Sequence, residues 1–272
     1  GDVYIQLDSL DLGQRSIENA VKLSNEYYIS YLAGYVYREH FLGDNPRYTF
    51  KGEGNNESFV LDFFRPQRDR LYLDVIRIFE EQVASFFGSP YAVAVDCCTH
   101  ALELCLRYQN IKQFSTPKRT YISVPFLANK LNIEHFWRDE EWSEFYFLGD
   151  TNIADAAVLW RKDSFIENTF MCLSFQYRKH LSLGRGGMIL TDNKKAAKDL
   201  KKMSYDGRIP MVPWREQNIS SIGYHYYMTP ETAQLGLDKL PEAINTEPKK
   251  WITTDWPDLT QLDVFKHRNG DF

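Results

Sequence analysis

An alternation of short apolar runs with amphipathic segments between residues 91 and 240 constrains the fold more than any other feature. The apolar runs have the length and residue content of buried strands. They are Ala92–Val95, Tyr121–Val124, Phe170–Phe175 and Met188–Thr191. Helical spacing occurs between and after them, over residues 99–109, 193–204 and 230–240. This alternation predicts an α/β fold whose ligands bind at the carboxyl ends of the strands.

The flanking segments suggest how the 272 residues are divided. Residues 71–88 form a candidate helix with an apolar face, and Gly88 is expected to end it. The first 60 residues combine helical spacing with a connector rich in turn residues. We therefore predict an N-terminal helical segment and connector over 1–60, an α/β domain over 61–240 and a short C-terminal segment over 241–272.

Charge and cysteine usage exclude several classes of function. The net charge of −5 argues against nucleic-acid binding, because phosphate contact needs a clustered basic surface. The basic run at 194–202 fits the solvent face of a helix capped by Asp192. Four cysteines show neither metal-type spacing nor a disulfide framework, and no apolar run is long enough to span a membrane. We expect a cytoplasmic protein with reduced thiols, no metal, and neither nucleic acid nor a membrane as partner.

A candidate reactive lysine lies between two predicted strands. Lys179 follows the strand Phe170–Phe175 in the stretch "SFQYRK". A lysine held on such a loop and partly removed from water can become a nucleophile for carbonyl compounds. A solvated lysine in a basic patch beside Arg178 and Arg185 is the alternative, and it is the more common case for this residue type.

Two more stretches offer groups that would fit the same chemistry. Residues 91–106 read as a strand running into a helix, whose first turn holds Cys98 and Thr99. Free N–H groups there suit a phosphate, although an ordinary Thr cap is the alternative. Asp155 lies among small apolar residues and needs a partner if it is buried, although a surface turn is the alternative. Pyridoxal phosphate requires a lysine, an acid for its ring nitrogen and donors for its phosphate.

Residues 66–240 resemble the DegT/StrS-type (DegT/DnrJ) sugar-nucleotide aminotransferases, which are fold type I enzymes dependent on pyridoxal phosphate. The resemblance rests on "FEEQVASFFGSPYAVAVDCCTHALEL", on "DAA" at 155–157, on "SFQYRK" followed by "GRGGMILTD", and on "GYHYYMTPETAQLGLDKL" at 223–240. It implies a three-layer α/β/α sandwich with a mostly parallel central sheet. Because the sequence ends soon after Leu240, the family's C-terminal small domain is expected to be largely missing.

The resemblance assigns roles to matching positions. Lys179 would carry the cofactor covalently and move a proton, while Asp155 would keep the pyridine nitrogen protonated. The phosphate would be held by Thr99, the backbone at Cys98 and Ser174. Cys98 departs from the family, which has a turn glycine at this position.

Four other positions are assigned with larger departures from the family. Phe126 or Asn129 would replace the usual ring-stacking aromatic, and Val158 stands where a polar residue near the cofactor ring is common. His225 would reach the phosphate from a neighbouring subunit, so the resemblance implies a homodimer. In the glycine-rich turn, Arg185 replaces a glutamate.

The function implied is a pyridoxal-phosphate-dependent aminotransferase. It would move an amino group, from glutamate in the family's manner, onto a nucleotide-linked keto-sugar for polysaccharide biosynthesis. One alternative is the related sugar dehydratase, which has a histidine at the lysine position; His180 is adjacent. Another is a catalytically degenerate member that binds a sugar nucleotide or a protein, which Val158 and Arg185 favour.

Overall fold

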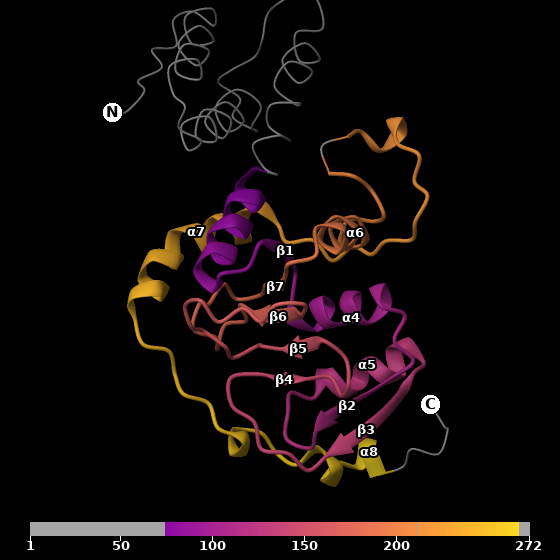
Figure 1. Cartoon of the computed structure of the whole chain (residues 1–272), viewed down its shortest axis with the longest axis vertical. Coiled ribbons are helices and arrows are strands. Elements are labelled where there is room, and N and C mark those ends of the chain that lie inside the picture. The colour runs from indigo at the N-terminus through magenta and orange to yellow at the C-terminus, as the bar shows by residue number, and fades with distance from the viewer. Residues whose placement is uncertain (1–73, 211, 267–272) are drawn as a thin grey trace, which may run out of the picture. The chain divides into compact units, whose positions relative to one another are not determined.

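The computed structural model describes residues 74–210 and 212–266 (Figure 1). At its centre lies a five-stranded sheet with strand order β1-β7-β6-β5-β4. Its strands are β1 (Tyr91–Val95), β4 (Tyr146–Phe147), β5 (Ile153–Asp155), β6 (Phe170–Ser174) and β7 (Gly187–Thr191). A separate parallel pair is formed by β2 (Gln113–Pro117) and β3 (Glu134–Arg138). The N-terminal segment predicted over 1–60 lies outside the described residues.

The predicted α/β class is confirmed, but the strand pairing is more mixed than expected. Strands β1, β5 and β6 run in the same direction, and β5 pairs with β6 in parallel. In contrast, β7 is antiparallel to both of its neighbours and β4 is antiparallel to β5. The predicted mostly parallel sheet is thus confirmed in that most strands point in the same direction, but most neighbouring strands pair antiparallel. The connections explain this, because the β6–β7 and β4–β5 loops contain no helical crossover, which a parallel partner would require.

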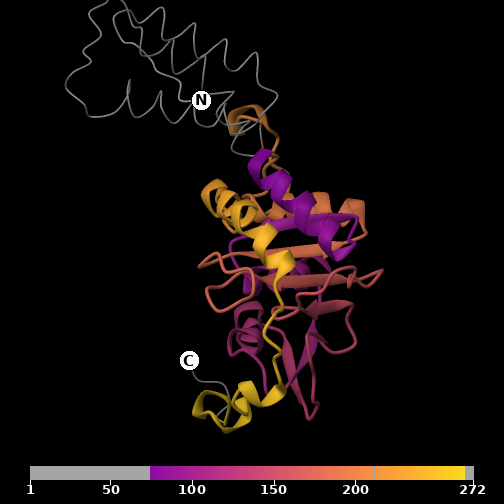
Figure 2. The same cartoon turned by 90° about the vertical axis from the view of Figure 1, so that its left-hand side faces the viewer.

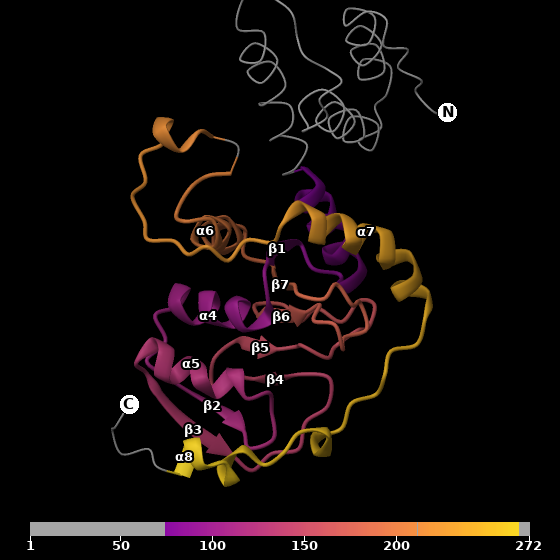
Figure 3. The same ribbon diagram turned by 180° about the vertical axis from the view of Figure 1, so that it is seen from behind.

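Helices accompany the sheet at the expected places. They are α4 (Cys98–Tyr108), α5 (Ser123–Leu131), α6 (Lys194–Ser204), α7 (Pro230–Asn245), α8 (Asp263–Lys266) and a helix that includes residues 74–87. The last of these ends where predicted, at Gly88, whose φ of +77° suits glycine. Figure 3 shows α4 and α5 next to one another along the sheet. Helix α7 continues past residue 240, the predicted domain boundary. Among the described residues, no helix has both the length and the apolar content needed to cross a membrane.

The predicted strand at Tyr121–Val124 is wrong, because α5 begins at Ser123. The buried residues Val124, Leu127 and Ala128 follow helical spacing and face the core. Pro125 lies in the first turn of α5, where a missing N–H is tolerated. The β-branched residues at 122 and 124 favour a strand locally, but a helix allows this segment to pack against the core.

The predicted cap of α6 is also wrong. The side chain of Asn193, not that of Asp192, accepts a hydrogen bond from the Ala196 N–H at 3.0 Å. Asp192 instead accepts a hydrogen bond from the Asn168 N–H at 2.7 Å. Both residue types cap helices well, so their order in the sequence could not separate them.

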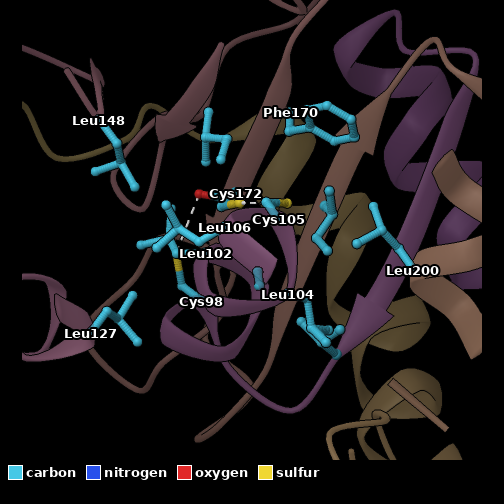
Figure 4. Close-up of a cluster of buried hydrophobic side chains, with 14 of the residues drawn as sticks. Cys98, Leu102, Leu104, Cys105, Leu106, Leu127, Leu148, Phe170, Cys172 and Leu200 are labelled. Carbon is cyan, nitrogen blue, oxygen red and sulfur yellow. Dashed lines mark hydrogen bonds between the residues drawn. The ribbon is translucent and has the colours of Figure 1, made fainter. Parts of the chain in front are cut away.

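Both faces of the sheet are covered, which gives three layers. On the α4 side, alternate strand residues such as Val93, Cys172 and Ile189 join one buried cluster with the apolar face of α4 (Figure 4). On the other side, Phe79 of the helix at 74–87 packs against Phe175, with ring centroids 5.5 Å apart. Helix α7 lies against this same helix (Figure 2), and a Cβ at Gly236 would be 2.5 Å from the Phe79 ring.

Candidate active site

The strand directions bring the predicted site residues to one edge of the sheet. Because β1, β5 and β6 run the same way, their carboxyl ends meet there. Cys98 and Thr99 follow β1, Asp155 ends β5 and Ser174 ends β6. Lys179 lies in the loop that leaves β6 at this edge. The order of the elements thus gathers residues that are far apart in the sequence.

Asp155 is buried, with 5% of its surface exposed, which excludes the surface turn that the sequence left open. Its Oδ2 accepts a hydrogen bond from Tyr146 Oη at 2.7 Å, and its Oδ1 accepts one from the Ala157 N–H at 3.1 Å. The Cys98 Sγ lies 3.9 Å from Oδ1. Burial raises the pKa of Asp155, while these hydrogen bonds and the charge of Lys179 act in the opposite direction. In the described part of the chain, every hydrogen bond to this carboxyl comes from a neutral group.

Tyr146 is a site residue that the sequence analysis missed. It lies on β4, is buried, and its hydroxyl also lies 2.5 Å from Thr120 Oγ1. Burial and the charge of Asp155 raise the pKa of Tyr146, so its hydroxyl stays protonated and donates to Asp155. The aromatic residues at 145–147 could have indicated a strand, but only the β4–β5 pairing places Tyr146 opposite Asp155.

Lys179 is half-buried on the β6–β7 loop, which favours the partly desolvated lysine over the solvated one, the alternative that the sequence left open. Its backbone N–H donates to the Gln176 carbonyl at 2.8 Å and closes a turn. Burial lowers the pKa of Lys179, although the nearby Asp155 carboxylate favours the charged form. A lowered pKa increases the fraction of neutral amine, which is the nucleophilic form. Lys179 and Asp155 are therefore close enough to influence each other's protonation.

The start of α4 lies against the beginning of β7. A Cβ added at Gly187 would be 2.4 Å from the Cys97 carbonyl carbon and 2.6 Å from the Cys98 nitrogen, so only glycine allows this approach. Cys97 is the N-cap, and no side chain caps this end of α4. The Thr99 hydroxyl lies 2.6 Å from Ser123 Oγ instead of capping the helix. The uncapped N–H groups and the helix dipole favour an anion here.

A charged network that the sequence analysis did not anticipate surrounds this helix start. His100 Nδ1 donates to Asp96 Oδ1 at 2.6 Å, and Arg185 donates to Asp96 Oδ2 at 2.8 Å. Burial disfavours the charged form of His100, but its hydrogen bonds to Asp96 and Cys97 prevail and raise its pKa to about 9. The His100 ring stacks on Tyr226 with centroids 3.7 Å apart. One atom each of Asp96, Cys97 and His100 lie within 4.8 Å of one another. The cationic partners of Asp96 nevertheless oppose a metal ion at this position.

The His100–Asp96 pair predicts a pH-dependent stability. Because the pKa of His100 rises from about 6.5 in the unfolded chain to about 9 in the folded one, its contribution is complete below pH 6.5 and is lost as the pH passes 9. After allowance for solvent screening we expect a loss of roughly 1–2 kcal/mol in the free energy of unfolding. Urea unfolding across this range measures it. His100→Phe keeps a ring on Tyr226 and should flatten the profile; an unchanged slope would contradict the assignment.

The other predicted site residues lie in different surroundings. Phe126 stacks on Phe265 with centroids 5.3 Å apart, and Asn129 is exposed on α5. Val158 is half-buried just beyond β5. His225 is exposed and its Nδ1 lies 3.1 Å from Asp206 Oδ1. Within the described chain, the structure thus brings together Lys179, Asp155 and Cys98.

Solved structures share this fold, and one sequence relative matches part of the chain. Uncharacterized protein MJ1066 of Methanocaldococcus jannaschii is 23% identical over a match covering 61% of this chain and 56% of its own length. The sugar aminotransferase CalS13 from Micromonospora echinospora matches with a TM-score of 0.55 and 13% identity, over 63% of this chain and 61% of its own. Spr1654 from Streptococcus pneumoniae, in its PLP-form, matches with a TM-score of 0.52 and 17% identity, over 63% and 60% of the two chains. The chain therefore spans less than two thirds of the length of these relatives.

The family comparison covers most of the site. The model of the DegT/DnrJ/EryC1/StrS aminotransferase family matches residues 73–140 and 165–251, which is more than half of the chain. The matched ranges contain the start of α4 and the loop of Lys179, whereas Asp155 lies in the gap between them. The expected resemblance is confirmed: the chain belongs to the DegT/DnrJ/EryC1/StrS aminotransferase family.

Proposed function

We propose that this protein is a pyridoxal-phosphate-dependent aminotransferase that transfers an amino group from glutamate to a keto group on a nucleotide-linked sugar. The observation that carries the proposal is that Lys179, whose pKa is lowered by burial, and the buried Asp155 lie at the same edge of the sheet, where the charge of each affects the pKa of the other. A nucleophilic amine next to a sequestered acid is the combination that amino-group transfer requires. Membership of an aminotransferase family supports the reaction class.

The residues at this edge fit the cofactor. Asp155 is a buried carboxyl whose hydrogen-bond donors are neutral, so a protonated ring nitrogen would supply the cation that compensates its burial. Lys179 offers the amine for covalent attachment, and the uncapped start of α4 offers N–H groups for a phosphate. We assign the phosphate to Thr99, Ser174 and the backbone at Cys98. When bound, pyridoxal phosphate withdraws electrons from the carbon that carries the amino group.

The chain's own residues would then divide the work. Lys179 would bind the cofactor at Nζ and, when released from it, move a proton to or from the substrate carbon. Asp155 would hold the proton on the ring nitrogen. Tyr146 fixes the orientation of that carboxyl through its 2.7 Å hydrogen bond. The loop turn closed by the Lys179 N–H limits the positions that the amine can reach.

The surroundings of His180 argue against the dehydratase alternative. Its Nε2 donates to the Ala243 carbonyl at 2.8 Å, and its ring packs against Trp160 with centroids 5.4 Å apart. Trp160 Nε1 donates to the same carbonyl at 2.9 Å. His180 therefore anchors the end of α7, and Lys179 remains the residue directed to the site.

We also propose that the active form is a homodimer. Large apolar side chains are exposed on the segment before His225: Ile209, Val212, Trp214, Ile219 and Ile222. Such side chains on one segment are typical of an interface. His225 would then contribute to the phosphate site of the partner subunit. Sedimentation velocity reports the assembly state directly. Roles in polysaccharide biosynthesis and in the cytoplasm stay predictions that follow from the proposed substrate and the four free cysteines.

Incubation with pyridoxal phosphate, glutamate and a panel of nucleotide-linked keto-sugars tests the proposal. We expect a visible absorption band that borohydride removes, and an amino-sugar product by mass spectrometry only when the cofactor is present. A deoxygenated product without nitrogen would favour a dehydratase. Binding of a sugar nucleotide with neither band nor product would favour a degenerate binding protein.

A further inference from the structure

The segment after α7, residues 246–262, crosses the molecule to reach α8 (Figure 1). Hydrogen bonds fix its second half. The Thr253 hydroxyl accepts from the Trp142 N–H at 3.2 Å and donates to the Trp142 carbonyl at 3.1 Å. Arg119 donates to the Trp256 carbonyl at 2.8 Å, and the Leu259 N–H donates to the Lys118 carbonyl at 2.9 Å. We call residues 246–262 the strap.

Aromatic rings connect the strap to the candidate active site. Trp251 packs on Trp256 with ring centroids 5.3 Å apart, and Trp256 packs on Trp142 at 4.8 Å. Trp142 then meets Tyr146 at 4.9 Å, and Tyr146 donates its hydroxyl proton to Asp155. Contacts at these distances are favourable aromatic pairs. Trp251 is therefore held by a continuous series of rings that ends at the buried acid.

At the other end of this series, Trp251 meets the reactive lysine. The Lys179 Nζ lies 5.2 Å from the centroid of the indole, and Lys249 Nζ lies 3.8 Å from the same centroid. Both distances are within the range of cation–π contact. The indole thus lies beside Lys179 Nζ, while the strap that carries it is fixed two residues later at Thr253.

We infer that Trp251 forms an aromatic wall of the active site, against which a planar carbonyl compound packs when it reacts with Lys179. The inference rests on the proposed function and deepens it. The sequence analysis expected Phe126 or Asn129 to supply this surface. Phe126 instead packs against Phe265, whereas Trp251 lies at Nζ. A wall of this kind favours aromatic carbonyl compounds over small non-aromatic ones, because only the aromatic compounds gain stacking energy.

Reductive labelling of Lys179 in the 272-residue chain tests the wall without any need for the cofactor. The protein is treated with cyanoborohydride together with either salicylaldehyde or formaldehyde. Peptide mass spectrometry then gives the rate at which each aldehyde labels Lys179, and the quantity compared is the salicylaldehyde rate divided by the formaldehyde rate. In Trp251→Leu we expect this ratio to fall by about fivefold, as for the loss of one aromatic pair. In Trp251→Phe the ratio should fall by less, and this variant provides the test if the leucine variant does not fold.

Phe136→Leu is the matched control, because Phe136 is an exposed aromatic side chain on β3 that takes no part in the series of rings from Trp251 to Tyr146. Its labelling ratio should equal that of the parent. An unchanged ratio in both Trp251 variants would overturn the inference. Titration with pyridoxal phosphate is run separately: if the parent does not bind it, the proposed function fails, whereas the labelling ratio still decides the role of Trp251.

Discussion

Lys179→Ala is expected to abolish amino transfer, with a fall of at least about three orders of magnitude, while the protein folds like the parent. The reason is that the variant lacks the amine that would bind the cofactor and move the proton. The side chain contributes little packing, since it is half-buried on a loop and the turn there is closed by its backbone N–H. Single-turnover amino transfer and the midpoint of thermal unfolding measure the two parts of this prediction.

Mass spectrometry after borohydride reduction identifies the lysine directly. The pyridoxyl group should be found on Lys179 in the parent and be absent from the variant. Lys162→Ala is the matched control, because Lys162 is exposed on the turn after β5. It should retain full activity. A pyridoxyl group on Lys162, or on Lys130, which is paired with Glu103, would contradict the assignment.

Asp155→Asn is expected to lower amino transfer by roughly two to three orders of magnitude, the range seen when an electrostatic partner of a reacting group is removed. The amide keeps the shape of the carboxyl and can still accept the hydrogen bond from Tyr146, so the fold should be retained. What is lost is the negative charge that would hold the ring nitrogen protonated. The cofactor should remain attached through Lys179, so the absorption band persists while turnover falls.

Two variants separate charge from hydrogen bonding at this site. Tyr146→Phe removes the hydrogen bonds of the Tyr146 hydroxyl to Asp155 and Thr120 but keeps the charge of Asp155, so it should reduce activity much less than Asp155→Asn does. Asp150→Asn changes an exposed carboxylate on the turn before β5 and should have no effect. If Asp155→Asn were as active as the parent, Asp155 would have no role in the chemistry.

Local sequence pattern was sufficient for much of the framework. The elements β1, β6 and β7 were predicted from their apolar runs, and α4, α6 and α7 from their helical spacing. Each of these elements buries at least one face, and the backbone geometry sets how often a side chain returns to a given face along the sequence. Prediction was wrong at α5, whose β-branched residues suggested a strand, and it missed β2 and β3, which are only partly buried. In those segments long-range packing outweighs local preference.

The sequence by itself determined that a lysine follows a buried strand and that an acid lies among small apolar residues, because both are features of the local sequence. Only the tertiary structure decided which groups surround them. Tyr146 reaches Asp155 through the pairing of β4 with β5, and Trp251 reaches Lys179 across 72 positions of sequence through the strap, as the residue numbers show. Contacts of this kind depend on how strands pair and how a segment crosses the fold, and neither leaves a periodic signal in the chain.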